Sequence, residues 1–336
     1  MIRNKLNIAV VAGGEQSEVI VSIQSAQGIV SFLDKDLFNP FIVVIEKNNW
    51  HVLLDQENHI PIDKNNFTFQ LDGKIIRFDC AYITIHGIPG EDGRLQGYFE
   101  MIDMPYTSCN VLTSALTYNK YFCNQFLKNF DINIAPSIHL SRNETVNVEK
   151  IMSEIGFPCF VKPNLGGSSF GVTKVKSLNE LPDAIQKAFG ESDEILIERF
   201  MDGVEVTNGI YKTKKRAVML PVTEVVPKNE FFDFEAKYKG RVEEITPARI
   251  SDTLTKSIQQ TSSKIYDLLN CHGIIRIDYI ITKGNQINLL EVNTTPGMTP
   301  TSFIPQQIPY AGLSVKEVLT EIIEDSIERK KILNDH

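Results

Sequence analysis

Short apolar runs alternate with longer segments of helical periodicity from the beginning of the chain. Residues 6–12 form an apolar run that leads into Gly13-Gly14, and residues 22–33 then follow a helical pattern. Two further β-rich runs span residues 40–45 and 81–85. A strand, a glycine turn and a helix in this order are typical of a small parallel α/β sheet. We therefore expect an N-terminal α/β domain over residues 1–110.

The pattern after residue 110 predicts two further units, so the fold class is mixed, α/β with α+β. We expect a central domain over residues 111–210 and a C-terminal domain over residues 211–336. The elements expected in the central domain are helices at 112–129, 149–155 and from Leu178, and strands at 160–162, 173–175 and 194–199. The C-terminal domain is expected to hold a strand at 218–226, a helix with Leu254, Ile258, Ile265 and Leu269 on one face, and a helix from Ser314.

A hairpin near the end of the chain carries the most informative polar pattern. The runs IIRIDYII and QINLLEVN flank a turn at Lys283-Gly284-Asn285. Because side chains alternate along a strand, Arg276 and Asp278 share one face of the first run, and Glu291 and Asn293 share one face of the second. Pairing about the turn should place the two polar pairs opposite each other. Three oxygen donors on one face suit a hard cation such as Mg²⁺, and Arg276 suits a phosphoryl group.

An exposed hairpin face whose polar residues simply meet water is the alternative interpretation. The functional interpretation is favoured because the hairpin continues into TTPGMTP, a loop rich in glycine and proline, rather than into another strand.

Two glycine-rich segments are further candidates for a binding site. In KPNLGGSSFGV, Lys162 precedes Gly166 and Gly167, and such a loop lets backbone N–H groups approach phosphate oxygens. It matches neither the P-loop nor the dinucleotide-binding pattern, and a loop of this kind is also typical of a surface turn. The segment HGIPGEDGRLQG follows the strand 81–85 at the sheet edge where α/β folds bind ligands. Glu91 and Asp92 in it would equally suit a helix cap, and His86 a structural histidine.

Composition narrows the class of protein. The 336 residues carry 34 Lys and Arg against 42 Asp and Glu, a formal net charge of −8, which disfavours binding to nucleic acid or to an anionic membrane. The five cysteines are scattered, without the spacing of a zinc site, and indicate buried thiols in a reducing compartment. No apolar run approaches the roughly 20 residues that span a bilayer. We expect a cytoplasmic protein.

Taken together, these segments resemble the D-alanine:D-alanine ligases of the ATP-grasp superfamily. The resemblance runs in order from Val10 to about Pro305 through GGEQSEVIVS, HGIPGEDGRLQG, ALTYNK, KPNLGGSSFGV, LIERFMDGVE, EAKY, RID and EVNTTPGMTPTS. It implies an ATP-grasp fold with an N-terminal parallel α/β domain, a central lid-like subdomain and a C-terminal catalytic subdomain. It also implies that two D-alanines are joined through an acyl phosphate for peptidoglycan synthesis, with ATP and two Mg²⁺ or Mn²⁺ ions, by a homodimer.

The resemblance assigns roles to individual residues. Those implied for ATP are Lys120 and Lys162 at the phosphates, Glu198, Arg199, Phe200 and Met201 at adenine, Glu205 at the ribose and Lys237 at the γ-phosphate. Asp278, Glu291 and Asn293 are implied as metal ligands. Those implied for the substrates are Glu18 and His86 at the first D-alanine, Ser302 at the carboxylate of the second, and Phe303 beside it. Ser168 and Tyr238 would join Glu18 in closing the site, and Arg276 with the Gly297 N–H would stabilise the oxyanion.

Three alternatives stay open at this point. D-Alanine:D-serine and D-alanine:D-lactate ligases share the phosphate and metal residues, although Tyr238 favours an amine rather than lactate as the second substrate. Phe303, where leucine is common, leaves the size of the second subsite open. From another class, an inactive nucleotide-binding regulator would keep the fold, but it would be expected to have lost a metal ligand or an ATP lysine, and none is missing.

Overall fold

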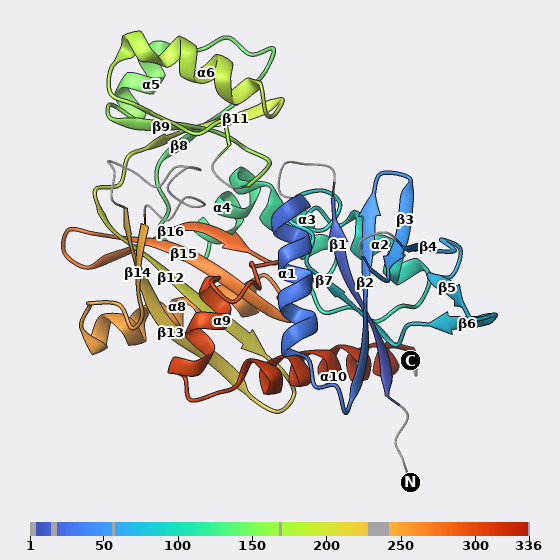
Figure 1. The fold of residues 1–336 in the computed structure, drawn as a ribbon. Coiled ribbons are helices and arrows are strands. Elements are labelled where there is room, and N and C mark those ends of the chain that lie inside the picture. The colour runs from blue at the N-terminus through green and yellow to red at the C-terminus, as the bar shows by residue number, and fades with distance from the viewer. Residues whose placement is uncertain (1–4, 15–18, 56–57, 168–169, 228–241, 335–336) are drawn as a thin grey trace.

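A computed structural model describes residues 5–14, 19–55, 58–167, 170–227 and 242–334 of the chain. Three main sheets with helices packed on them make up the molecule (Figure 1). The described helices include none long and apolar enough to cross a membrane.

The first sheet has the strand order β4-β3-β2-β1-β7. Its strands are β1 (Leu6–Gly13), β2 (Phe38–Glu46), β3 (Asn49–Leu53), β4 (His59–Pro61) and β7 (Cys80–Ile83). β1 pairs in parallel with β2 and β7, as the sequence predicts, whereas β3 and β4 extend the sheet with antiparallel strands that the sequence did not reveal. A separate hairpin, β5 (Thr68–Leu71) with β6 (Lys74–Arg77), lies beside it, and helices α1 (Val19–Phe32) and α2 (Arg94–Met101) complete this part.

The second sheet, with the order β10-β9-β11-β8, lies in the upper part of Figure 1, beneath the helices that cover it. Its strands are β8 (Ser137–Ser141), β9 (Cys159–Pro163), β10 (Thr173–Val175) and β11 (Glu194–Arg199). The helices α5 (Val148–Glu154) and α6 (Leu181–Phe189), preceded by the short η1 (Leu178–Glu180), cover one face and bury a separate apolar core. The face of this sheet that these helices do not cover is turned toward the rest of the molecule.

The third sheet has the order β14-β13-β12-β15-β16 and is antiparallel throughout. Its strands are β12 (Gly203–Lys212), β13 (Ala217–Pro227), β14 (Val242–Ile245), β15 (Ile274–Thr282) and β16 (Gln286–Asn293). Helix α8 (Asp252–Leu268) packs Leu254, Ile258 and Ile265 onto it, as the helical pattern predicts. Because β12 pairs only within this sheet, the expected domain limit at residue 210 falls inside a strand.

One predicted helix is in fact two. The segment expected as a single helix over 112–129 forms α3 (Val111–Tyr118) and α4 (Lys120–Lys128), and the break lies at Asn119. Asn119 ends α3 and caps α4, since its side chain accepts a hydrogen bond from the Phe122 N–H at 3.0 Å. The expectation was wrong because the apolar pattern continues across the break, and the only local signal is a single asparagine.

The C-terminal region closes the molecule against the first sheet. Helix α10 (Val315–Asn334) begins next to the expected Ser314 and buries Val318, Leu319, Ile322 and Ile323 in one core with β1 and α1. Helix α9 (Phe303–Tyr310) precedes it and was not predicted, because Pro305 and Pro309 are more typical of a loop than of a helix. All five cysteines are buried thiols, as expected.

Candidate active site

The polar face of the β15–β16 hairpin lies as the strand alternation predicts. Arg276 pairs with Asn293 and Asp278 pairs with Glu291 across the two strands. The turn is tight because Gly284 and Asn285 both adopt positive φ, 79° and 61°, which these two residue types tolerate best. The predicted juxtaposition of the two polar pairs is therefore confirmed.

Arg276 is the buried centre of this face. It donates three hydrogen bonds to Asp278, from Nε to Oδ1 at 2.9 Å and to Oδ2 at 3.2 Å, and from Nη2 to Oδ2 at 2.8 Å. Its Nη2 also lies 3.7 Å from Glu291 Oε1. Burial alone would lower the pKa of the guanidinium, but the neighbouring Asp278 carboxylate raises it. Arg276 is thus a permanent, preorganised cation at the base of the site.

Two adjoining cavities meet at this hairpin. The larger, about 980 Å³, lies between the second and third sheets, and the smaller, about 340 Å³, is also lined by residues of α1 and of the loop after β7. Both are lined by Arg276, Glu291, Lys120 and Phe303. A ligand in one cavity can therefore reach a ligand in the other beside the acid face.

The larger cavity collects the residues that the resemblance assigns to a nucleotide. Lining it are Lys120, Lys162, Glu198, Arg199, Phe200, Met201, Glu205, Asp278 and Glu291. Lys162 and Glu198 form a buried ion pair at 2.9 Å across β9 and β11, which are neighbours in the second sheet. The Phe200 ring has the Lys174 ammonium 4.0 Å from its centroid and lies 6.0 Å from the Phe160 ring, so this part of the cavity offers aromatic surface as well as charge.

Lys120 reaches the glycine loop from a different element. It is the first residue of α4, and its Nζ donates a hydrogen bond to the Gly166 carbonyl. The two cationic side chains proposed for phosphates thus come from different elements, α4 and β9, and both line one cavity.

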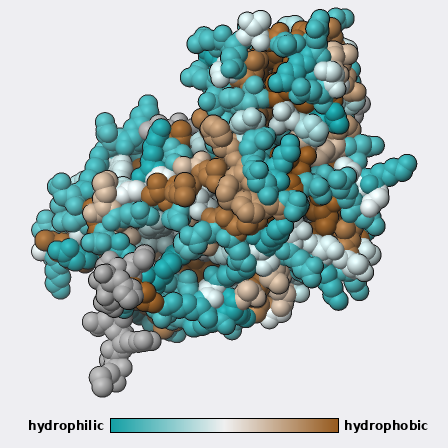
Figure 2. Space-filling model, turned by 180° about the vertical axis from the view of Figure 1, so that it is seen from behind, coloured by the Kyte–Doolittle hydropathy of each residue, from teal (hydrophilic) through white to brown (hydrophobic). Residues whose placement is uncertain are grey.

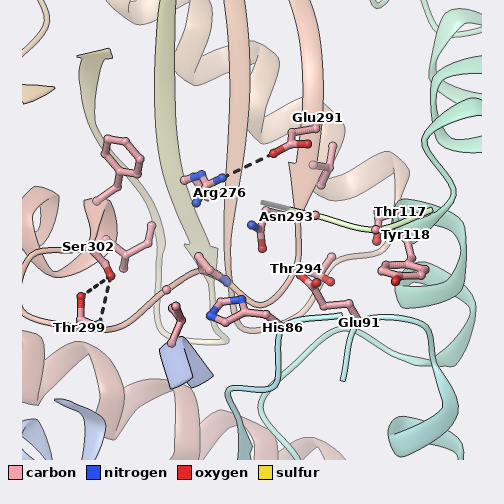
Figure 3. Close-up of a pocket in the computed structure, with 18 of the residues that line it drawn as sticks. His86, Glu91, Thr117, Tyr118, Arg276, Glu291, Asn293, Thr294, Thr299 and Ser302 are labelled. Atoms are coloured by element: carbon pink, nitrogen blue, oxygen red, sulfur yellow. Dashed lines mark hydrogen bonds and ion pairs between the residues drawn. The ribbon is translucent and has the colours of Figure 1, made fainter. Parts of the chain in front are cut away.

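The smaller cavity collects the residues expected at the amino-acid substrates. It is lined by His86, Arg276, Glu291, Asn293, Gly297, Ser302 and Phe303. In Figure 3, Arg276 and Glu291 project from neighbouring strands, with His86 and Glu91 across the cavity from them. The Arg276 guanidinium lies 5.5 Å from the centre of the Phe303 ring. Of the two residues that would suit a helix cap, Glu91 instead accepts from the Gly87 N–H at 2.7 Å, whereas Asp92 Oδ1 accepts from the N–H of Arg94, the first residue of α2, at 3.3 Å. The residue before α2 is Gly93, with no side-chain cap.

The loop after β16 is held in place from two sides. The Ser302 Oγ accepts a hydrogen bond from the Thr299 N–H at 3.1 Å and lies 2.8 Å from the Thr299 Oγ1 (Figure 3). A Cβ at Gly297 would lie 2.9 Å from the Ser302 Oγ, so only glycine leaves this approach open. On the other side, the Met298 N–H donates to Ser25 of α1 at 3.3 Å. The loop is therefore a fixed wall of the smaller cavity.

Sequence reasoning missed at least one residue on the acid face. Thr207 of β12 donates its hydroxyl to Asp278 Oδ1 at 2.5 Å, and both are buried. Thr207 faces Asp278 across the β12–β15 pairing, a register set by strands 71 residues apart that no local pattern reveals. Glu18, Ser168, Lys237 and Tyr238 lie outside the residues that the structure describes, so their roles stay predictions.

The donor set of the acid face fits a hard divalent cation. It offers two carboxylates, Asp278 and Glu291, and the Asn293 amide oxygen, all on facing positions of one hairpin. Among the residues with described positions, no three Asp, Glu, His or Cys side chains gather as a metal-binding group. Oxygen atoms of a phosphate and of water would have to complete the coordination, as is usual for Mg²⁺.

Comparison with known proteins agrees with this geometry. Residues 7–109 match the family described as D-ala D-ala ligase N-terminus, and residues 126–324 match D-ala D-ala ligase C-terminus. The D-alanine--D-alanine ligase of Parabacteroides distasonis is 58% identical over 97% of this chain and 99% of its own length. Among solved structures, a D-Ala:D-Ser ligase from Enterococcus faecalis superposes with a TM-score of 0.86 at 31% identity, covering 96% of this chain and 100% of its own. The D-alanine-D-alanine ligase from Coxiella burnetii superposes with a TM-score of 0.87 at 26% identity, covering 98% of this chain and 96% of its own. With both of its halves matched in order and its fold shared over nearly the whole length, the chain belongs to the D-alanine--D-alanine ligase family.

Proposed function

We propose that this enzyme joins two D-alanine molecules into D-alanyl-D-alanine, a precursor of peptidoglycan, through a D-alanyl phosphate formed from ATP. The observation that carries the proposal is the meeting of two cavities at Arg276 and Glu291, one suited to a nucleotide and one to small amino acids. The γ-phosphate at the end of one cavity would face the carboxylate of a substrate in the other.

The larger cavity would hold ATP. Lys120 and Lys162 would bind the phosphates as point charges, and Glu198 to Met201 would contact adenine. Glu205 would accept hydrogen bonds from the ribose hydroxyls. Their common position around one cavity supports these roles, whereas the role of Lys237 at the γ-phosphate rests on the resemblance alone.

The smaller cavity would hold the two D-alanines. His86 would lie near the carboxylate of the first, and Ser302, with Phe303 beside it, would bind the carboxylate of the second. Glu18 would take the ammonium of the first, with Ser168 and Tyr238 closing the site. These last three assignments follow from the resemblance alone.

The chemistry takes place in two transfers. An oxygen of the first carboxylate attacks the γ-phosphorus and ADP leaves, which forms an acyl phosphate. The amine of the second D-alanine then attacks the acyl carbon, loses a proton, and inorganic phosphate leaves. Arg276 and the Gly297 N–H would stabilise the oxyanion of the tetrahedral intermediate, since preorganised donors of this kind contribute strongly to catalysis.

Asp278, Glu291 and Asn293 would hold two Mg²⁺ or Mn²⁺ ions. Such ions, when bound, neutralise charge on the transferring phosphate. The chain's own contribution is to present these three oxygen donors beside the Arg276 cation on a rigid hairpin.

The organisation of the chain is proposed as three parts, residues 1–110, 111–202 and 203–336, with the second limit moved so that β12 stays with its sheet.

A cytoplasmic homodimer is proposed as the working form. Apolar side chains gather in the middle of the back face, below the protruding upper part of the molecule (Figure 2), and exposed apolar patches are typical of interfaces. Among the described residues, Met101 and Leu112 are large apolar side chains exposed by 80% and 75%.

Phosphate release from ATP tests the proposal. Wild-type enzyme with Mg²⁺ would be offered D-alanine, L-alanine, D-alanine with D-lactate, and D-alanine with D-serine. We expect release and dipeptide with D-alanine alone, and no release with L-alanine. A mixed product formed in preference to D-alanyl-D-alanine would reassign the second substrate. If no phosphate is released with any substrate while ATP still binds, the alternative of an inactive nucleotide-binding regulator would be favoured.

A further inference from the structure

The buried Asn164 lies just beyond the predicted phosphate residues, two positions after Lys162 and two before Gly166. We infer that Asn164 is a positioning residue that fixes Lys120 relative to Lys162 in the nucleotide cavity. This inference rests on the proposed function only in taking ATP as the ligand of that cavity.

Four hydrogen bonds converge on Asn164, whose exposed fraction is 0%. Its side-chain oxygen accepts from the Tyr121 N–H at 2.9 Å, and its amide donates to Glu194 Oε2 at 2.7 Å. Its backbone oxygen accepts from the Lys120 N–H at 3.3 Å, and its backbone N–H donates to the Glu194 carbonyl at 2.9 Å. Asn164 therefore ties the first turn of α4 to strand β11.

These bonds satisfy backbone groups that a helix cannot satisfy by itself. The first N–H groups of a helix have no partner within it. In α4, Asn164 accepts from Lys120 and Tyr121, and the Asn119 side chain accepts from Phe122. Asn164 is thus a cap supplied by another part of the molecule, and removing its side chain would leave the partly buried Tyr121 N–H without its acceptor.

The hydrogen bonds of Asn164 affect the spacing between Lys120 and Lys162. The body of α4 packs Cys123 and Leu127 into the core of the third sheet, whereas Lys162 lies on the second sheet, which has its own core. Lys120 and Lys162 therefore belong to elements that pack into different cores. Asn164, two residues after Lys162, connects these elements through its hydrogen bonds to the first turn of α4. A polyphosphate that needs both cations needs their spacing to be fixed before it binds.

Glu194 and His139 complete the anchor. Burial would raise the pKa of Glu194, but the hydrogen bond from Asn164 and the nearby His139, 3.2 Å away, lower it. The His139 ring also stacks on Tyr121 at 4.8 Å. The Glu194 carboxylate accepts from the amide at position 164, whereas an aspartate there would have no proton to donate and would repel it.

The test compares the binding of ATP with Mg²⁺ to the wild type and to three variants by titration calorimetry, together with steady-state kinetics. Asn164→Ala should weaken ATP binding and raise the KM for ATP about tenfold, the equivalent of one lost hydrogen bond. The KM for D-alanine should stay within about twofold. Asn164→Asp should bind ATP more weakly still, and adding Glu194→Gln to it should restore binding about tenfold by removing the repulsion. Should Asn164→Ala not fold, the isosteric Asn164→Asp carries the test.

Asn208→Ala is the matched control. Like Asn164, Asn208 is 0% exposed and lines neither cavity, but its side chain donates to the Leu220 carbonyl of β13 at 2.6 Å instead of joining α4 to β11. It should lose comparable stability and bind ATP like the wild type. Unchanged ATP binding in both Asn164 variants, or equal weakening in Asn208→Ala, would overturn the inference. Because ATP binding is measured directly, this result is separate from the phosphate-release test of the proposed function.

Discussion

The two halves of the candidate site obtain their geometry in different ways. On the acid face, Arg276, Asp278, Glu291 and Asn293 belong to one hairpin, and the pairing of two adjacent strands is sufficient to bring them together. Around the nucleotide cavity, by contrast, Lys120 comes from a helix packed on the third sheet and Lys162 from the second sheet.

This difference separates chemistry from positioning. The acid face is rigid and local, so a change there should remove a chemical group and leave the other half of the site unaffected. The cation pair is assembled across two cores, so a change at a distance from the ligand should alter affinity through spacing. The predictions below test this division in order of expected effect.

The largest effect is expected on the acid face. Glu291→Gln removes one carboxylate from the proposed metal set and should lower kcat at least about a hundredfold, because charge stabilisation at the transferring group is lost. Asp278→Asn should do the same and also destabilise the fold, since it weakens the partner of the buried Arg276. Phosphate-release kinetics and thermal unfolding measure both. Wild-type turnover in Glu291→Gln would remove the metal assignment.

A close contact between α1 and the loop after β16 should give the next largest effect. A Cβ on Gly28 of α1 would lie 2.4 Å from the Met298 carbonyl, next to the Gly297 N–H. Gly28→Ala should displace this wall of the smaller cavity and raise the KM for D-alanine at least about tenfold, with little change in the KM for ATP. Gly97→Ala in α2, where the new Cβ would meet nothing closer than 3.8 Å, is the control. Equal KM values for D-alanine in the two variants would contradict the role of the Gly28 contact in positioning this wall.

A smaller effect is expected at the break between α3 and α4. Asn119→Ala removes the cap that precedes Lys120 and should raise the KM for ATP about threefold, with about 1 kcal/mol of lost stability. Asn147 caps α5 with nearly the same backbone angles, φ −90° and ψ 94° against −89° and 98°, and lies outside both cavities. Asn147→Ala should lose similar stability with an unchanged KM, and a raised KM in this control would show that capping alone explains the effect.

The smallest effect concerns an ion pair beside the third sheet. The Arg249 guanidinium donates to the Glu224 carboxylate at 2.6 Å and 2.9 Å and lowers the pKa of that group. A lowered pKa stabilises the fold above the ordinary glutamate value, 4.5, and the stabilisation is lost as the pH falls through the lowered value. Arg249→Gln should therefore lower the free energy of unfolding only slightly at pH 7, since Arg249 is largely exposed, and the loss should shrink progressively below pH 4.5. Denaturant unfolding at several pH values would show this, and a constant difference would contradict it.

The same division explains how much the sequence could predict. The hairpin, the strand 194–199 and the helical face of Leu254, Ile258 and Ile265 were predicted correctly because each depends on the period of one or two neighbouring elements. The break at Asn119, the partner Thr207 and the helix α9 were missed. Each depends on strands or cores far apart in the sequence, or on prolines that mask a helix.

The fate of an oxygen label tests the central claim that the two cavities meet in an acyl phosphate. D-Alanine labelled with ¹⁸O in its carboxylate would be incubated with ATP, Mg²⁺ and the enzyme, and the products would be measured by mass spectrometry. The account predicts that one labelled oxygen of the first D-alanine appears in inorganic phosphate for each dipeptide formed. Unlabelled phosphate, or label in AMP, would contradict it.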